Sequence, residues 1–474
     1  MWDLHSFADG SENQRKLSGI AMKNQFWKIP TMFYILLLLG VTVMNLDAKT
    51  NPKDDILNVR TFGAIGDGKH DDTTAIQSAI DASSTTGNKL YIPTGKYVVT
   101  KELYVKPGAT IEGAANSPTY NKPLTGTIIL AKHGRDKEDA PALFTMNDSS
   151  SVSGLTIYYP EQKADDIHPY SWTFHMVDND NTLENITLIN SYNAIKVGGE
   201  AWNVRHRIRS VYGCALRRGI YVDGCSDVGR IDNVHFHGHW WWAKEVGGAP
   251  DVNGKFGLVN QYLFDNLEAF VFGRTDWEYV SNTFVFIAKT GYRFIKTSKG
   301  SGSFQMTGIG ADAVHDSVVV DGAASWWTIL ITNGQFASTG SDKDAIGILI
   351  NSNDDPAANA PIRLVNCSIL APRGVVANGP SFTSLTGCYI NTWGGATGSP
   401  LIEATNGKIQ VQGCTFDANM GGKLKPMPSI ALRPGVKYAI VTGNMGVNGV
   451  EIINEIGDKA IIKDNEPHEE EAVK

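Results

Sequence analysis

The stretch that decides the fold spans residues 58–83 and reads NVRTFGAIGDGKHDDTTAIQSAIDAS. Its second half has apolar residues at i, i+3 and i+4 spacing, which predicts one short amphipathic helix. Asp72 can cap this helix, and Gly87 can end it. Beyond it, short apolar–polar alternations are broken by Gly, Asn, Asp and Pro, a pattern typical of strands. The apolar positions of the helix are Ala75, Ile76, Ala79 and Ile80.

The short strands recur along the chain. NITLIN, HRIRSV and GRIDNV align at Ile186, Ile208 and Ile231, which are 22 and 23 residues apart. Such repeats, each with a strand and a turn, indicate a solenoid. In the C-terminal half a second alignment puts three cysteines and one asparagine at the same position of successive repeats. We expect the cysteines to stack as buried thiols rather than to form disulfides. We expect the asparagine to belong to a ladder of hydrogen-bonding side chains at the turns. These four residues are Cys367, Cys388, Cys414 and Asn444.

The opening stretch, with LYIPTGKYVV at residues 90–99 and PGATIEG at residues 107–113, resembles the start of the pectate-lyase-like superfamily. Members of this superfamily are right-handed parallel β-helices and include rhamnogalacturonase- and polygalacturonase-like enzymes and phage tailspikes. The resemblance therefore implies an all-β, right-handed parallel β-helix whose short N-terminal helix caps the open end of the solenoid. It also implies an enzyme or a binding protein for polysaccharides.

On this basis we divide the chain into four segments. Residues 1–48 are an N-terminal extension and signal segment, and residues 49–57 are a linker. Residues 58–465 are the β-helix, and residues 466–474 are an acidic tail.

The N-terminal segment has the pattern of a secretory signal. Residues 29–43 form a mostly apolar, uncharged run that is shorter than the ~20 residues of a membrane-spanning helix. Lys23 and Lys28 precede the run, and Ala48 offers a cleavage end. The pattern opens at Met22, which we interpret as the start. We expect a secreted or periplasmic protein without a stable membrane span after cleavage; an uncleaved signal anchor is the alternative.

The composition of the chain argues against several classes of protein. A net charge of -7 argues against general nucleic-acid binding. A hydrophobic fraction of 42% argues against disorder over most of the chain. Five Cys in 474 residues are not a disulfide framework. We expect a polysaccharide partner, no cofactor and no metal ion, with the oligomeric state open.

A basic stretch stands out in this acidic chain. If Ile208 points inward, the arginines that alternate with it point outward on one face. Guanidinium groups match carboxylates bidentately, so we expect an anionic polysaccharide to bind there. The alternative is a set of ion pairs with Asp and Glu on neighbouring coils. The expected binding residues are Arg205, Arg207, Arg209 and Arg218, with Arg217 and Arg230 nearby.

The next stretch is rich in His and Trp. His235, His237 and His239 alternate with apolar residues and are too far apart on a flat strand to share one metal ion. We expect His237 to contact the substrate. Three consecutive Trp cannot all be buried in a strand, so Trp240 or Trp241 is expected to stack on a sugar ring; a folded-back hydrophobic plug is the alternative.

Two pairs of carboxylates are candidates for acid–base catalysis. Asp276 and Glu278 fall at i and i+2, and Asp223 and Asp227 flank a turn. Glycoside hydrolysis needs two carboxyl groups across the scissile bond, so a hydrolase is the preferred prediction. Turn capping is the alternative for each pair.

Two other functions stay open. A polysaccharide lyase would use the arginine row and His235 to remove a proton beside a uronate carboxylate. A non-catalytic β-helix would only bind glycans. The polygalacturonase motifs are not intact, since His237-Gly238-His239 stands in place of Gly-His-Gly, so no catalytic residue transfers by motif.

Overall fold

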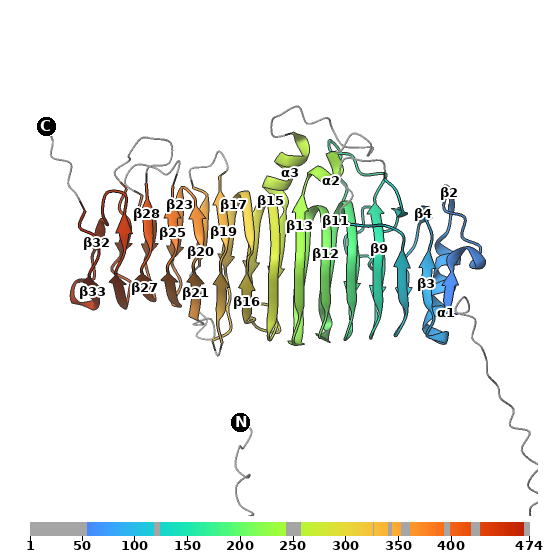
Figure 1. Cartoon of the computed structure of the whole chain (residues 1–474), viewed down its shortest axis with the longest axis horizontal. Coiled ribbons are helices and arrows are strands. Elements are labelled where there is room, and N and C mark those ends of the chain that lie inside the picture. The colour runs from blue at the N-terminus through green and yellow to red at the C-terminus, as the bar shows by residue number, and fades with distance from the viewer. Residues whose placement is uncertain are drawn as a thin grey trace, which may run out of the picture. The chain divides into compact units, whose positions relative to one another are not determined.

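The computed structural model describes residues 55–117, 124–242, 257–325, 327–339, 344–351, 361–392, 399–418 and 427–468. These residues wind into a right-handed parallel β-helix (Figure 1). Strands pair in parallel with the strands of the coils before and after them. The fold class expected from the sequence is therefore confirmed. The expected signal segment lies outside the described residues.

Each coil contributes to three sheets, which we call sheet I, sheet II and sheet III in the order in which a coil passes through them. Sheet I contains β1 (Ile56–Asn58), β3 (Lys89–Ile92), β6 (Thr110–Gly113), β16 (Phe304–Thr307), β18 (Ile329–Thr332), β21 (Pro361–Val365), β24 (Phe382–Thr386), β27 (Lys408–Gln412), β30 (Tyr438–Thr442) and β33 (Ala460–Lys463). Sheet II contains β2 (Asp67–Asp71), β4 (Gly95–Val99), β7 (Thr127–Ala131), β19 (Gln335–Ser338), β22 (Ser368–Leu370), β25 (Tyr389–Asn391), β28 (Thr415–Asp417) and β31 (Met445–Gly446).

Sheet III carries the candidate site described below. It contains β5 (Leu103–Val105), β8 (Phe144–Met146), β10 (Trp172–Met176), β14 (Glu268–Phe272), β20 (Ile346–Ile350), β23 (Arg373–Ala377), β26 (Ile402–Ala404), β29 (Ile430–Leu432) and β32 (Ile452–Asn454). Long strands bend from one sheet into the next: β9 (Ser151–Tyr158), β11 (Thr182–Val204), β12 (Arg207–Asp227), β13 (Arg230–His237), β15 (Glu278–Phe294) and β17 (Gly310–Val320).

Inward side chains stack from coil to coil and form the core. In sheet I one row consists of Val152, Leu183, Ile208, Ile231 and Val280, none more than 1% exposed. In sheet III, Phe270 stacks on Tyr292 with ring centroids 4.8 Å apart. Because parallel strands repeat every ~4.8 Å, identical slots on successive coils meet directly.

The bends between sheets I and II explain the repeated polar residues. In coil after coil the residue at this bend takes a left-handed conformation, with φ between 53° and 67°. Asn and Gly tolerate this conformation better than branched residues do. Examples are Asn185, Ser210, Asn233 and Asn282.

The predicted cysteine column follows the same bend in the C-terminal coils. Cys367, Cys388 and Cys414 are buried, free thiols. Asn444 occupies the next slot, and its Oδ1 accepts the backbone N–H of Cys414 at 2.8 Å. The stacked thiols and the hydrogen-bonding amide are confirmed.

The helix expected from the opening stretch is α1 (Thr73–Thr86), which packs at the blue end of the β-helix (Figure 1). Gly87 ends it in a left-handed conformation, as predicted. Asp72 precedes α1, but its side chain makes no capping hydrogen bond. Its carboxylate instead accepts the backbone N–H groups of Ile65 and Gly66, at 2.7 and 3.1 Å. Capping by the Asp72 side chain is therefore wrong; this carboxylate fixes the Gly-rich turn.

Asp72→Ala should lower the free energy of unfolding by about 1–3 kcal/mol, because two partly buried backbone hydrogen bonds lose their acceptor. Urea unfolding followed by circular dichroism measures the change. Asp81→Ala on the exposed face of α1 is the control, since its ion pair with Lys106 is solvent-exposed. Equal stability losses in both variants would contradict the role of Asp72.

Two further helices, α2 (His239–Trp242) and α3 (Leu258–Asn266), lie beside β11, β12 and β15 (Figure 1). Two short 3-10 helices, η2 (Val59–Phe62) and η4 (Gly457–Lys459), complete the elements of the described part. Within that part, no helix combines the length and the apolar character needed to cross a bilayer.

Candidate functional site

The arginines expected to form one basic face lie on different sheets. Ile208 is buried as predicted, and Arg207 and Arg209 flank it on sheet I. Arg218 lies on sheet III, in register with Glu268. A coil has three faces, and residues one coil apart meet only when they share a sheet. A single binding face made of all four expected arginines is therefore wrong.

Two of the arginines on the sheet I side, Arg205 and Arg209, have acidic partners on the neighbouring coil. Arg205 donates to both carboxylate oxygens of Asp180, each at 2.7 Å. Arg209 pairs with Glu184. These are the ion pairs that the sequence left as the alternative.

The tryptophans expected to stack on sugars are buried. Trp240 is 6% exposed and Trp241 is fully buried. Residues 239–242 form α2 instead of continuing the strand, and Trp240 packs against Tyr212 and His235. The prediction that Trp240 or Trp241 presents a face to a sugar is wrong. These side chains instead form the folded-back hydrophobic plug that was the alternative.

The three His also belong to this plug. His237 stacks on His239 and on Phe286, and its Nδ1 accepts the backbone N–H of His239. Burial, with the neighbouring imidazoles, lowers the pKa of His237 to about 3. Burial also lowers the pKa of His235, whose ring meets Phe284 edge-on. Neutral imidazoles packed on aromatic rings are typical of a hydrophobic cluster.

The first carboxylate pair does not face a common space. Asp276 forms a bidentate ion pair with Arg274. Glu278 is fully buried, where its Oε1 bonds to Nε2 of His206 at 3.0 Å and its Oε2 accepts the hydroxyl of Thr275 at 2.9 Å. The expectation that Asp276 and Glu278 share one open face is wrong, because the chain turns between them at Trp277, with φ 55°.

The second pair is also divided. Oδ1 of Asp223 accepts the backbone N–H of Arg274 at 2.9 Å and the hydroxyl of Thr297 at 2.8 Å. Asp223 thereby ties two turns together, which matches the turn-cap alternative. Asp227 lies in the next turn, where its carbonyl accepts the backbone N–H of Arg205.

A buried polar cluster escaped the sequence analysis. His206, Cys225 and Glu278 are all fully buried, and their ligand-type atoms lie within 4.8 Å of one another. Nδ1 of His206 lies 3.0 Å from Oδ1 of Asn203 and 3.6 Å from the Cys225 sulfur. Burial lowers the pKa of His206, but the charge of Glu278 and the hydrogen bonds to Cys225 and Glu278 together outweigh burial and raise the pKa to about 10.

This cluster is best described as a buried ion pair. Cys225 and Glu278 contact opposite nitrogens of the His206 ring, so one metal ion cannot reach both through the imidazole. The imidazolium finds an acceptor at each nitrogen instead. Gly229 makes room for the pair, since a Cβ there would lie 2.3 Å from both His206 and Glu278.

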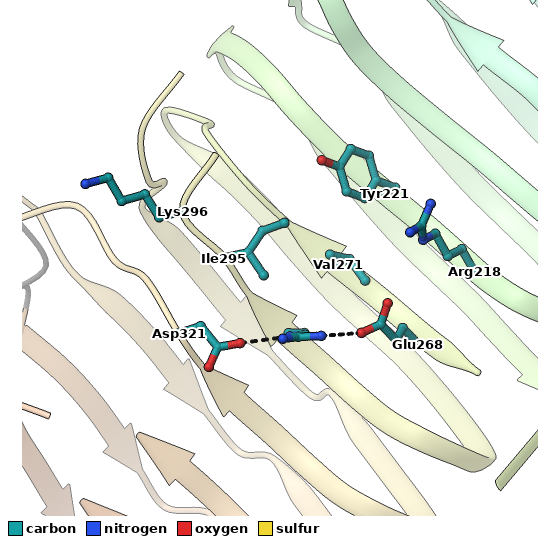
Figure 2. Close-up of a pocket in the computed structure, with 8 residues that line it drawn as sticks. Arg218, Tyr221, Glu268, Val271, Ile295, Lys296 and Asp321 are labelled. Atoms are coloured by element: carbon teal, nitrogen blue, oxygen red, sulfur yellow. Dashed lines mark hydrogen bonds and ion pairs between the residues drawn. The ribbon is translucent and has the colours of Figure 1, made fainter. Parts of the chain in front are cut away.

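The outer face of sheet III contains an open pocket of about 460 Å³ (Figure 2). Strands β12, β14 and β15 supply its floor, and the turns after β15 and β17 supply one edge. We call this pocket and the adjoining outer face of β10 and β11 the groove. The pocket is lined by Arg218, Tyr221, Glu268, Val271, Arg293, Ile295, Lys296 and Asp321.

Three polar side chains of the groove point outward from adjacent coils. Lys196 and Tyr221 are register partners, so they lie about one strand spacing apart. Arg218 lies three residues before Tyr221 on the same strand (Figure 2). Within the described part of the chain, none of these three side chains has a hydrogen-bond or ion-pair partner. Half-buried polar groups without partners are poised to receive a ligand.

Burial shifts the pKa values of the ionisable groups in the groove. Burial lowers the pKa of Lys196, and the nearby Arg218 and Lys299 add to this effect while Glu200 and Asp223 oppose it. Burial raises the pKa of Tyr221, and Asp223 adds to it. On the preceding coil, burial lowers the pKa of His175 to about 4.

The carboxylates of the groove are already engaged. Nη1 of Arg293 lies 2.5 Å from Glu268, and Nε of Arg293 lies 2.8 Å from Asp321. Figure 2 marks these contacts with dashed lines at the labelled Glu268 and Asp321. Arg217 approaches Glu268 from the other side at 3.6 Å. The groove thus contains two carboxylates, Glu268 and Asp321, that are paired with Arg293. It also contains the three side chains without a partner described above, those of Lys196, Tyr221 and Arg218.

Comparisons with known proteins agree with the fold. A family model described as "Rhamnogalacturonase A/epimerase, pectate lyase-like" matches residues 56–127. The catalytic unit of a GH87 alpha-1,3-glucanase from Streptomyces thermodiastaticus superimposes with a TM-score of 0.54 at 11% identity, covering 87% of this chain and 71% of that one. The N-terminal part of the chain is thus similar to this family, and the chain has the fold of a pectate-lyase-like parallel β-helix. This confirms the resemblance seen in the opening stretch.

Curated relatives of this pectate-lyase-like chain match over short segments. Alginate lyase 7 of Azotobacter vinelandii is 39% identical over 97 residues, covering 17% of this chain and 11% of that protein. Plasmin and fibronectin-binding protein A of Streptococcus pneumoniae is 28% identical over 196 residues, covering 39% of this chain and 24% of that protein. The chain thus matches at most a quarter of the length of these two relatives.

The sequence did contain a signal for the missed groove residues. IKVGG at residues 195–199 and IYVDG at residues 220–224 align as Ile-x-Val-x-Gly. This alignment puts Lys196 over Tyr221, as in the structure. A coil-by-coil alignment of sheet III would have singled out this pair.

Proposed function

We propose that the protein binds an anionic polysaccharide in the groove and removes the proton beside a uronate carboxylate. The observation that supports this most is the set of three unpartnered side chains, Arg218, Tyr221 and Lys196, on adjacent coils of sheet III. The export expected from the N-terminal segment would bring the enzyme to such polymers outside the cytoplasm.

Each of the three groups suits one step. Arg218 pairs with the uronate carboxylate and stabilises the enolate that forms when the neighbouring carbon loses its proton. The neutral amine of Lys196 accepts that proton, and its lowered pKa favours the neutral form. Tyr221 keeps its proton because its pKa is raised, so it can donate to the leaving glycosidic oxygen.

The enolate has two possible fates. Loss of the glycosidic oxygen, which takes up the Tyr221 proton, breaks the chain and leaves an unsaturated sugar, as in a lyase. Return of a proton to the opposite face of the carbon inverts the sugar without breaking the chain, as in an epimerase. Both fates share the first step, so the first step is what an experiment should test.

Incubation with polygalacturonate and alginate in deuterium oxide tests the proposal. We expect deuterium at the carbon beside the carboxylate in the epimerase case, or ultraviolet absorbance from an unsaturated product in the lyase case. New reducing ends without either signal would support a hydrolase and contradict the proposal. Binding without any product would support a glycan-binding β-helix.

A hydrolase is the second candidate, and one observation favours it. Glu268 and Asp321 line the same pocket. Both are paired with Arg293, so neither is free to hand a proton to a leaving oxygen. For this reason we rank proton abstraction first. Asp276, Glu278, Asp223 and Asp227 give less support to a hydrolase, because their carboxylates are engaged elsewhere or lie apart.

Arg218→Ala should lower kcat/KM by about 10- to 100-fold, because a charge-assisted hydrogen bond to the substrate carboxylate is lost. Arg207→Ala is the matched control, since Arg207 is an exposed arginine on sheet I. Initial rates on the polymer that the wild type modifies give both values. Equal rates for Arg218→Ala and the wild type would remove Arg218 from the site.

A further inference from the structure

Three tryptophans are exposed among the described residues, and all three lie where the chain passes from sheet III to sheet I. Trp202, Trp277 and Trp327 are 45%, 42% and 41% exposed. They belong to the first, third and fifth of five successive coils, so neighbouring members are separated by two coils, or about 10 Å along the axis. We call these three residues the tryptophan line.

Two members of the tryptophan line touch each other. The rings of Trp277 and Trp327 meet edge-to-face with centroids 4.9 Å apart. The turn of the coil between them, residues 295–303, ends in the small residues Gly-Ser-Gly-Ser. The pair offers apolar ring surface to solvent, since each residue is more than 40% exposed.

The third member carries positive charge. Nζ of Lys299 lies 5.0 Å from the centroid of the Trp202 ring, and the guanidinium of Arg274 lies 5.8 Å from it. Both cations have fixed positions: Lys299 donates to the carbonyl of Glu200 at 2.9 Å, and Arg274 pairs with Asp276.

The tryptophan line borders the groove. Lys296 and Asp321 belong to the same row of turns and line the pocket of the groove. Asp223 holds this row in place, because it bonds to the backbone of Arg274 and the hydroxyl of Thr297. A ligand that runs along the β-helix axis in the groove therefore passes beside the line.

We propose that the tryptophan line is a second sugar-binding surface that holds the polysaccharide beside the groove. Trp277 and Trp327 stack on the C–H faces of pyranose rings, and Lys299 beside Trp202 pairs with an acidic group of the same polysaccharide. The path of the polysaccharide along the groove depends on the proposed function, but sugar binding by these tryptophan rings does not.

The double variant Trp277→Ala/Trp327→Ala tests this surface with alginate and polygalacturonate, using calorimetry for affinity. We expect the Kd of the polymer that the wild type binds to rise roughly tenfold, since two stacking contacts are lost. Where the polymer is turned over, KM should rise with it while kcat stays within a small factor. Tyr438→Ala is the matched control, because Tyr438 is an exposed aromatic residue (39%) in the C-terminal coils.

Three outcomes separate this surface from the groove chemistry. Weaker binding by the tryptophan variant, with no proton exchange even in the wild type, supports the surface and contradicts the proposed function. Unchanged affinity in the tryptophan variant, with proton exchange intact, contradicts the surface alone. A wild-type protein that binds neither polymer contradicts both. Thermal unfolding of all variants confirms that they are folded.

Discussion

Replacing Lys196 by arginine lowers kcat by about 10²- to 10⁴-fold, the usual contribution of a general base. Arginine keeps the positive charge but does not lose its proton in proteins, so it cannot accept one from the substrate. Lys408→Arg on β27, where Lys408 is exposed, is the matched control. Deuterium incorporation into the substrate at saturating polymer concentration is the measurement.

The pH dependence gives an independent check of the same assignment. Activity rises with pH as Lys196 loses its proton, and burial moves this limb below the ordinary pKa of lysine. Activity falls where Tyr221 loses its proton, and burial moves that limb above the ordinary pKa of tyrosine. The result is a bell-shaped profile on the alkaline side. Tyr221→Phe removes the Tyr221 ionisation and slows chain cleavage. Wild-type exchange rates in Lys196→Arg would exclude Lys196 as the base.

The fold was predictable because its signals are local. The apolar stripe of α1, the turn at Gly87 and the alternation around Ile208 each depend on residues a few positions apart. The column of Cys367, Cys388 and Cys414 was also readable, since one slot per coil repeats in the sequence. In a parallel β-helix, local periodicity and repeat spacing together fix which side chains point inward.

The site was harder to predict because alternation distinguishes inside from outside but not one outer face from another. Arg207 and Arg218 are both outward, yet they lie on sheets I and III. Glu278 shows a second difficulty. A carboxylate in a polar stretch was expected at the surface, but Glu278 is buried in the core because it pairs with His206, which lies 72 residues away in the sequence. That partnership depends on the stacking of three coils, which no local pattern reveals.

The buried pair of Glu278 and His206 predicts a large effect on stability rather than on turnover. Glu278→Gln leaves His206 without its anionic partner, and breaking a buried ion pair from one side costs about 3–5 kcal/mol. Asp180→Asn breaks the exposed pair with Arg205 and should cost only about 0–1 kcal/mol. Urea unfolding of both variants, with m-values compared to the wild type, gives the two free energies.

The sign of the pH dependence follows from the raised pKa of His206. The pKa is about 10 in the folded protein and ~6.5 in an unfolded chain. The pair therefore contributes its full stabilisation below about pH 6.5, and this contribution is lost as the pH rises through about 10. Glu278→Gln should be less stable than the wild type at pH 6, and the difference should shrink toward pH 10 as His206 deprotonates in the folded wild type. A stability gap that stays constant across this range would show that His206 is not charged in the folded protein, and that Glu278 contributes through packing and neutral hydrogen bonds.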